Sequence, residues 1–320
     1  MQAERELAEV APHKDTVLTI GVFDGVHLGH KHLIDRTIKS AKTENAMSGV
    51  VTFRRHPVEF LDPKASLPYL TSLEEKTRLM KAEGVDFVVA LTFDADLARL
   101  TAKDFSALLK KYLRMRGLVI GPDFALGRDR EGNVAMLRKI GETSGFFVEV
   151  VPPLKIKGEV VSSTAIREAL ARGDMARVVR LTGRPYLVRG TVVAGTGLGR
   201  EIGFPTANLK IEGGWAIPRD GVYATLTHVN GDVYQSMTSI GVRPTFGGTS
   251  KTIETYILDF RKDIYGREVA IDIVDRLREE KKFASAEDLK KQIDEDIKRG
   301  KAILDSLGAR KPGMRSRGEE

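Results

Sequence analysis

The sequence predicts an α/β protein in two parts: an N-terminal half with a parallel sheet, followed by a C-terminal antiparallel β-barrel with a terminal helix. Between residues 17 and 151, apolar strand-like runs alternate with helical patterns, an order typical of a parallel sheet covered on both faces. From residue 186 onward, short alternating strands separated by glycines are typical of a closed barrel. The length of 320 residues also favours two domains over one.

The composition narrows the class of protein further. Apolar residues make up 42% of the chain and charged residues 30%, as in ordinary globular proteins. The net charge of +7 suits anionic small molecules such as nucleotides, whereas nucleic-acid binding would need a basic stripe with aromatic platforms that the sequence lacks. Because the chain has no cysteine and no apolar run of about 18 residues, we expect no disulfide and no membrane span, and we favour the cytoplasm.

Residues 17–30 predict a buried strand, a tight turn and the start of a helix, with His27 and His30 at that start. A helix N-terminus presents unpaired backbone N–H groups and a partial positive charge, so it attracts phosphate. Gly29 lets a ligand approach the backbone closely. Two imidazoles three residues apart can share one side of the first turn, where they could stabilise charge that develops on a phosphorus centre.

Two alternatives remain open for this histidine pair. The two side chains could simply lie on the surface of a strand–helix turn. A zinc site that includes the nearby His32 is disfavoured, because cysteine is absent and the spacing differs from the His-Glu-x-x-His of a helical zinc pair.

Further strands are predicted at residues 49–53, 87–93, 118–121 and 146–151, with helices near 73–83 and 105–112. The second strand ends in the basic turn Arg54-Arg55-His56-Pro57. Open α/β sheets bind ligands at the carboxyl edge, so this turn is a candidate binding segment.

A second helix whose N-terminus suits phosphate binding is predicted in residues 160–173. Ser162 or Ser163 is a natural N-cap, and Gly173 is a natural C-terminal stop. Arg167, a cation in the first turn, opposes the helix dipole at a cost of about 0.3–1 kcal/mol. An anion held between the cap and the guanidinium would explain it, although Arg167 could also extend into solvent.

The second half of the chain predicts strands at residues 186–193, 221–228, 233–240, 252–260 and 268–274. A final amphipathic helix follows, with Leu289, Ile293 and Ile297 at four-residue steps. Residues 309–320 are polar, and we expect them to be disordered.

Three features of the second half carry chemistry. Residues 195–200 form a glycine-rich loop that precedes no predicted helix, so it is not a Rossmann fingerprint. Thr206 and Asn208 share one face of an extended segment, and their neutral oxygens suit Mg²⁺ beside nucleotide phosphates. Glu254 lies within an apolar strand; it is a candidate base if its face turns inward and an ordinary solvent-facing residue if not.

Taken together, these residues resemble the bacterial bifunctional riboflavin kinase/FMN adenylyltransferases, also called FAD synthetases, from about residue 16 to 308. Each motif alone is weak evidence for the family, but all of them in this order are specific to it. The motifs are Gly21-Val-Phe-Asp-Gly-Val-His-Leu-Gly-His30, Thr52-Phe53, Gly121-Pro-Asp-Phe124, Ser162-Ser-Thr-Ala-Ile-Arg167, Gly203-Phe-Pro-Thr-Ala-Asn208, Gly241-Val-Arg-Pro-Thr-Phe246, Glu254, Tyr265-Gly266 and Leu277-Arg-Glu-Glu-Lys-Lys-Phe283. Two segments depart from the family pattern near the expected flavin-phosphate pocket: Arg54-Arg55 and Ala125-Leu126.

The resemblance implies a Rossmann-like FMN adenylyltransferase domain over residues 1–183. There, the FMN phosphate attacks the α-phosphorus of ATP and gives FAD and pyrophosphate. His27 and His30 would stabilise the developing charge. The residues implied to bind ATP are Gly21, Phe23, Asp24, Ser163, Thr164 and Arg167, and those implied to bind the flavin are Phe53, His56, Asp123 and Phe124.

The resemblance also implies a riboflavin kinase barrel over residues 184–308, which transfers the γ-phosphoryl group of Mg²⁺-ATP to riboflavin. Glu254 would take the hydroxyl proton, and Arg276 and Phe283 would contact the flavin. Thr206 and Asn208 would hold the metal-bound phosphates. The remaining residues implied to bind ATP are Gly195, Gly197, Gly199 and Arg200.

Two rival functions are weighed against this one. The chain could be an FMN adenylyltransferase with a non-catalytic flavin-binding barrel, but Thr206, Asn208 and Glu254 are all present. It could be a flavin-binding regulator, but the presence of His27 and His30 argues against that. As partners we expect only riboflavin, FMN and ATP, without nucleic acid or membrane, and at most a weak homo-oligomer.

Overall fold

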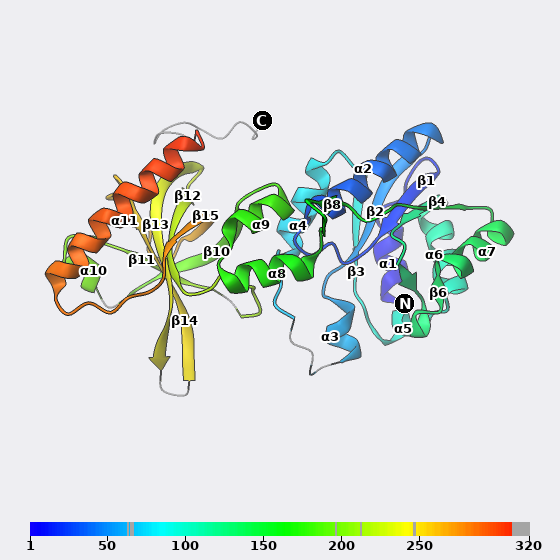
Figure 1. Ribbon diagram of the computed structural model, residues 1–320. Coiled ribbons are helices and arrows are strands. Elements are labelled where there is room, and N and C mark those ends of the chain that lie inside the picture. The colour runs from blue at the N-terminus through cyan, green and yellow to red at the C-terminus, as the bar shows by residue number, and fades with distance from the viewer. Residues whose placement is uncertain (63, 65–66, 196, 212, 246–247, 309–320) are drawn as a thin grey trace. The chain divides into compact units, whose positions relative to one another are not determined.

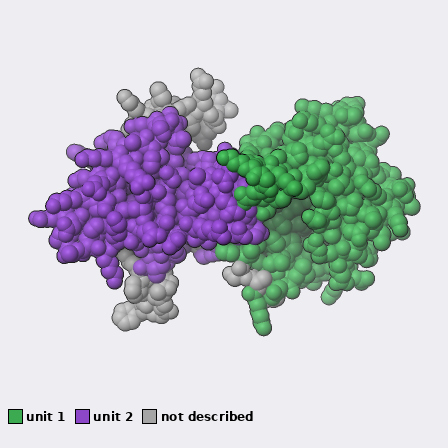
Figure 2. All heavy atoms as spheres, in the orientation of Figure 1, with its two compact units in different colours: residues 1–163 green, residues 164–320 purple. Residues whose placement is uncertain are grey.

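The computed structural model describes residues 1–308 except 63, 65–66, 196, 212 and 246–247 (Figure 1). The chain divides into two compact units, Met1–Ser163 and Thr164–Glu320 (Figure 2), and each is described by itself. The expected disordered tail, 309–320, lies outside the described residues. The division of labour at residues 183 and 184 concerns activity and stays a prediction.

Unit 1 contains a five-stranded parallel sheet in the order β3-β2-β1-β4-β7, as the sequence predicts. Strand β1 pairs with β2 on one side and with β4 on the other, so the strand order reverses at β1. Such a reversal opens a crevice at the carboxyl ends of the strands, where ligands bind in open α/β sheets. The strands are β1 (Thr16–Ile20), β2 (Met47–Phe53), β3 (Phe87–Leu91), β4 (Met115–Ile120) and β7 (Phe147–Val150).

Helices cover both faces of this sheet because alternate strand residues are apolar on each face. On one face, Val17 and Val119 pack with Ala41 of α2. On the other face, Leu18 and Leu118 join a larger core with residues of α1 and α6. The helices are α1 (Gln2–Ala8), α2 (Leu28–Thr43), α3 (Pro57–Leu61), α4 (Leu73–Ala82), α5 (Ala95–Arg99), α6 (Ala102–Leu113) and α7 (Val134–Ser144).

The predicted helices α2, α4 and α6 are confirmed, whereas the sequence analysis missed α1, α3, α5 and α7. Helix α1 shows why. Its seven residues are too few to give a detectable helical pattern, although Ala3 and Leu7 are completely buried. Short ribbons and a turn complete unit 1: β5 (Ala125–Leu126), η1 (Arg128–Arg130), β6 (Gly132–Asn133), β8 (Lys155–Ile156) and β9 (Glu159–Val160).

Unit 2 contains a closed antiparallel barrel in the order β10-β11-β14-β13-β12-β15, which confirms the predicted barrel. Strands β13 and β15 extend several residues beyond the predicted segments, and β14 begins and ends earlier than the predicted 252–260. The strands are β10 (Tyr186–Val193), β11 (Ala207–Lys210), β12 (Gly221–Val229), β13 (Asp232–Thr245), β14 (Gly248–Ile257) and β15 (Glu268–Arg278).

The terminal helix α11 (Ala286–Ser306) packs on the barrel through Leu304, which joins a core with Val222 and Met237. Gly300 allows this close approach, because a Cβ there would lie 2.3 Å from the Met237 sulfur. The other helices of the unit are α8 (Ser163–Arg172), which begins at the last residue of unit 1, α9 (Met175–Thr182) and α10 (Leu198–Glu201). Among all described helices, none is long and apolar enough to cross a membrane.

Candidate active sites

The loop between β1 and α2 forms the first candidate site at the reversal of strand order. His27 is the N-cap of α2, and its Nδ1 accepts a hydrogen bond from the His30 backbone N–H at 3.2 Å. The two imidazole rings stack with centroids 3.6 Å apart and planes 15° from parallel. His27 is only 4% exposed. The structure therefore brings the two predicted histidines together and disfavours a pair of solvated surface side chains.

This histidine loop, residues 21–30, is held in an unusual backbone conformation. Phe23 and Val26 have φ values of 53° and 35°, in the left-handed region that side chains seldom adopt. Gly29 fits closely at the helix start, since a Cβ there would lie 3.0 Å from the Val161 carbonyl oxygen and 3.1 Å from His27 Nδ1. Strain of this kind gathers at functional sites and persists only where surrounding contacts impose it.

Asp24 supplies much of that constraint. Its buried carboxylate accepts hydrogen bonds from the backbone N–H groups of Leu70 and Thr71 at 3.0–3.1 Å. The Thr71 hydroxyl in turn accepts from the Gly25 N–H at 2.9 Å. Asp24 thus anchors the loop to the segment before α4. Its predicted contact with ATP stays a prediction.

A cavity of about 360 Å³ lies at the same edge of the sheet. Four residues predicted to bind the flavin in unit 1, Phe53, His56, Asp123 and Phe124, line it together with Gly21. The rest of the lining is mostly apolar, which suits a flat aromatic ring system. The cavity thus unites side chains from segments that are far apart in the sequence.

Aromatic side chains extend one wall of this cavity. Phe93 makes edge contacts with Phe53 and with Phe60 of α3, each with centroids 5.8 Å apart. His56 caps α3, and its backbone N–H donates to the Tyr69 hydroxyl at 2.9 Å. Burial, aided by the nearby carboxylate of Glu59, raises the pKa of Tyr69 to about 12. Sequence analysis missed Phe60 and Phe93, although Phe93 ends a predicted strand.

The two departures from the family pattern have different surroundings. Arg54 forms an ion pair with the buried carboxylate of Glu6 on α1, with Nε and Oε1 3.1 Å apart. Ala125 and Leu126 form the short strand β5 and line the cavity with apolar surface. Arg54 therefore has a structural partner in helix α1, which the sequence analysis did not predict.

The predicted phosphate-binding residues of α8 straddle the two units. Ser163 belongs to unit 1, and its hydroxyl donates to the Asp24 carbonyl oxygen at 2.8 Å. Thr164 and Arg167 belong to unit 2. Their predicted contacts with ATP stay predictions.

The second candidate site lies where β11 and β14 pair in the barrel. Asn208 lies directly opposite Glu254 in the antiparallel register, so their side chains share one face. The Thr206 hydroxyl lies 3.5 Å from Glu254 Oε2. Glu254 is half-buried, on the face opposite its buried neighbours Ile253 and Thr255, so it does not share the inward face that the sequence analysis expects of a base. The structure therefore brings together the three residues predicted for phosphoryl transfer.

The glycine-rich loop packs directly against this cluster. A Cβ at Gly195 would lie 2.1 Å from the Asn208 amide nitrogen, and one at Gly199 would lie 3.1 Å from the Thr206 hydroxyl. Gly197 has a φ of 82°, which only glycine adopts readily. The sequence analysis expects no helix after this loop, and here it is wrong, because α10 forms one helical turn at Leu198–Glu201.

A cavity of about 620 Å³ adjoins the cluster at Thr206. Arg200, Thr255 and Tyr265 contribute to its lining. Gly195 and Gly199 approach the cluster through the loop, and none of the three loop glycines lines this cavity. Thr206 is thus the point where the cavity meets the pair of Asn208 and Glu254.

The predicted flavin contacts of the barrel lie elsewhere. Arg276 on β15 donates to the Asp220 carbonyl oxygen at 2.6 Å and lies beside Tyr223. Burial raises the pKa of Tyr223 to about 12, against the opposing effect of the Arg276 charge. The guanidinium carbon of Arg278 lies over the Phe283 ring, 5.7 Å from the ring centroid. Arg278 also forms an ion pair with Asp296 of α11. Their roles in flavin binding stay predictions.

A zinc site at the histidine pair would need a cluster of metal-ligating side chains. Among the described residues, no group of three or more histidine, aspartate or glutamate side chains could hold a metal ion.

The fold and the two sites define the class of protein: an α/β unit with a phosphate-type helix start, joined to a barrel with a polar cluster suited to phosphoryl groups. Comparison with known proteins identifies the family. The FAD synthetase family model matches residues 9–165, and the riboflavin kinase model matches residues 182–304. The chain belongs to the bifunctional riboflavin kinase/FMN adenylyltransferase family.

Relatives match over nearly the whole chain. The Escherichia coli K12 bifunctional riboflavin kinase/FMN adenylyltransferase is 39% identical over 288 residues, covering 89% of this chain and 92% of the relative. The Haemophilus influenzae protein of the same name is 37% identical, covering 90% and 94%. A Streptococcus pneumoniae crystal structure, named as a macrolide-efflux protein, superposes with a TM-score of 0.86 at 32% identity, covering 94% of this chain and 97% of that one.

Proposed function

We propose that this chain makes FAD from riboflavin in two steps, with phosphorylation in unit 2 and adenylylation in unit 1. The observation that carries the proposal is that one chain holds both the stacked histidines at a strand reversal and the Thr206–Asn208–Glu254 cluster. We place the domain that forms FAD within residues 1–183 and the domain that forms FMN within 184–308. Both steps consume ATP, which favours a cytoplasmic location.

In unit 1, an oxygen of the FMN phosphate attacks the α-phosphorus of ATP. The bond to the β-phosphate breaks, and pyrophosphate leaves. No base is needed, because a phosphate monoester is already ionised at neutral pH. His27 and His30 stabilise the charge that builds on the α-phosphoryl oxygens, as preorganised donors do. The apolar cavity beside Phe53 and Phe124 holds the flavin ring. The start of helix α8, with Ser163, Thr164 and Arg167, belongs to the proposed domain of residues 1–183 and holds the departing phosphates.

In unit 2, the 5′-hydroxyl of riboflavin attacks the γ-phosphorus of Mg²⁺-ATP, and ADP leaves. Glu254 accepts the hydroxyl proton. Thr206 and Asn208 offer neutral oxygens, which fit Mg²⁺ bound to nucleotide phosphates. Phosphoryl transfer depends mainly on positioning and charge neutralisation, and Glu254 lies close enough to Thr206 to act on the same group.

The test is incubation of the purified chain with riboflavin and Mg²⁺-ATP, with flavins separated by chromatography over time. We expect FMN to appear first and FAD to follow, with both reactions lost when Mg²⁺ is chelated. Direct supply of FMN should give FAD without a lag. A chain that makes FAD from FMN but never phosphorylates riboflavin would support the single-activity alternative instead. The same samples, measured by light scattering, report whether the chain forms even a weak oligomer.

A further inference from the structure

One charged side chain in unit 1 is buried and takes no part in the reaction described above. Lys76 of α4 is only 3% exposed. Its local sequence, Leu73-Glu-Glu-Lys-Thr-Arg78, is charged like a solvent-facing helix. Because an ammonium group is costly to bury without partners, its partners indicate what it does.

Those partners are two main-chain carbonyl oxygens at the carboxyl edge of the sheet. Lys76 Nζ donates to Val22 O at 3.1 Å and to Phe53 O at 2.6 Å. Val22 follows β1 and starts the run to His27, while Phe53 ends β2. One ammonium group therefore ties together the ends of two neighbouring strands.

Each tied strand end carries part of the adenylyltransferase site. Val22 and Phe53 both line the cavity of unit 1, and the Thr52 hydroxyl also donates to Val22 O at 3.0 Å. The anchors of Asp24, Leu70 and Thr71, lie just before the same helix α4. The segment 70–76 thus holds the histidine loop at two places.

We propose that Lys76 is a positioning residue for adenylyl transfer, which fixes the histidine loop against the flavin-pocket wall by holding the carbonyl groups of Val22 and Phe53. The proposal rests on the proposed adenylyl transfer in unit 1. Lys76 acts through the loop and the wall rather than by touching substrate.

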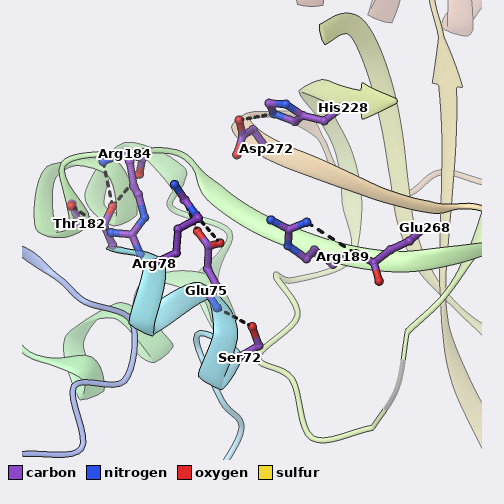
Figure 3. A network of polar contacts seen from close by, with 9 residues as sticks. All are labelled: Ser72, Glu75, Arg78, Thr182, Arg184, Arg189, His228, Glu268 and Asp272. Carbon is purple, nitrogen blue, oxygen red and sulfur yellow. Dashed lines mark hydrogen bonds and ion pairs between the residues drawn. The ribbon is translucent and has the colours of Figure 1, made fainter. Parts of the chain in front are cut away.

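The electrostatic surroundings of Lys76 make this role dependent on its protonation. Burial lowers the pKa of Lys76 from 10.5 to about 8, and the Asp24 carboxylate only partly offsets that effect. On α4 itself, Glu75 is paired with Arg78 at 2.7 Å (Figure 3). Hydrogen bonds from a charged donor are roughly twice as strong as neutral ones. Loss of the proton therefore weakens both ties to the strand ends.

The first test compares Lys76→Met with Lys81→Met, the same change at an exposed position of the same helix. Misplacement of reacting groups by about 1 Å can cost 10²-fold, so we expect Lys76→Met to lower kcat for FMN adenylylation by that order. Riboflavin phosphorylation, measured in the same sample, should match the Lys81→Met control. Equal adenylylation in the two variants, or an equal fall of both reactions in Lys76→Met, would overturn the proposal.

The second test needs no substitution and so does not depend on whether a variant folds. In the unaltered chain, the ratio of adenylylation to phosphorylation should fall as pH rises through about 8. The second phosphate pKa, about 6, lies well below this range. A constant ratio between pH 7 and 9.5 would overturn the proposal, whereas a chain that makes no FAD at any pH would overturn the proposed function itself.

Thermal unfolding separates this effect from loss of structure. The unfolded chain, with a lysine pKa of 10.5, binds more protons than the native state between about pH 8 and 10.5. The contribution of Lys76 to stability therefore rises with pH over that interval. The Lys76 contribution is the difference in unfolding free energy between the unaltered chain and Lys76→Met. If adenylylation falls with pH while this difference rises, Lys76 acts by positioning. If both fall together, the proposal is contradicted.

Discussion

The two candidate sites are built in different ways. In unit 1, His27 and His30 are neighbours in sequence, and a strained loop with a helix cap sets their geometry. In unit 2, Asn208 and Glu254 are 46 residues apart, and antiparallel pairing of β11 with β14 places them opposite one another. The first site thus depends on local backbone conformation, and the second on strand register. Substitutions should therefore separate the two reactions cleanly.

The largest separation is expected at Glu254. Glu254→Gln keeps the shape of the side chain and its place in the register but removes the proton acceptor. A general base contributes about 10²–10⁴-fold, so riboflavin phosphorylation should fall by that factor with little change in the KM for ATP. Adenylylation of supplied FMN should be unchanged. Near-normal phosphorylation would show that positioning by Thr206, Asn208 and the metal is sufficient.

The reciprocal change is His30→Ala. Loss of one preorganised donor typically costs about 10²–10³-fold in rate, so FAD formation from FMN should fall by that order. FMN formation from riboflavin should continue at the normal rate, which also reports that the chain is folded. If FAD formation persists at the normal rate, the stacked histidines are only a structural cap of α2.

A matched pair of glycine substitutions compares how much displacement each site tolerates from the loop beside it. In Gly195→Ala the new methyl would lie 2.1 Å from the Asn208 amide, so that amide must move. A shift of about 1 Å can cost 10²-fold, and we expect such a loss in phosphorylation. Gly29→Ala meets its neighbours at 3.0–3.1 Å, which requires only a small shift, so its effect on adenylylation should be smaller. The reverse order of effects would show that the histidine loop tolerates less displacement than the glycine-rich loop.

The sequence predicts the arrangement of the first site more fully than that of the second, and the reason is physical. Hydrophobic periodicity and turn residues locate His27 and His30, because the strand, turn and helix that hold them are contiguous. Periodicity cannot show which face Glu254 occupies, since that depends on how β14 pairs with β11. Lys76 escapes notice because its sequence neighbours are charged, and only the tertiary fold reveals that it is buried.

The same limit applies to the cavity of unit 1. The resemblance implies Phe53, His56, Asp123 and Phe124, and the structure places all four around one cavity at the carboxyl edge of the sheet. Helix α1 is missed, because seven residues of mixed charge give too short a pattern to detect. Glu6 of α1 pairs with Arg54, which departs from the family pattern near the expected flavin-phosphate pocket.

The smallest effect is expected at that pair. Buried Glu6 accepts hydrogen bonds from the backbone N–H and hydroxyl of Thr92, each at 2.7 Å, as well as from Arg54. Burial alone would raise the pKa of Glu6, but the hydrogen bonds from Thr92 and the weaker ones from Gln2 and Arg54 outweigh it and lower the pKa below 4.5. The resulting stability is present above pH 4.5 and is lost as pH falls through the lowered pKa.

Because the Arg54 side chain is 50% exposed and Thr92 satisfies Glu6 as well, Arg54→Ala should cost only about 0.2–1 kcal/mol of unfolding free energy. Urea unfolding at pH 7 measures this cost, with Arg55→Ala as the control at the adjacent exposed arginine. The KM for FMN should stay unchanged in Arg54→Ala, since its charge is directed to α1. A raised KM for FMN without loss of stability would instead indicate that Arg54 contacts the FMN phosphate. The first site would then include a residue outside the histidine loop.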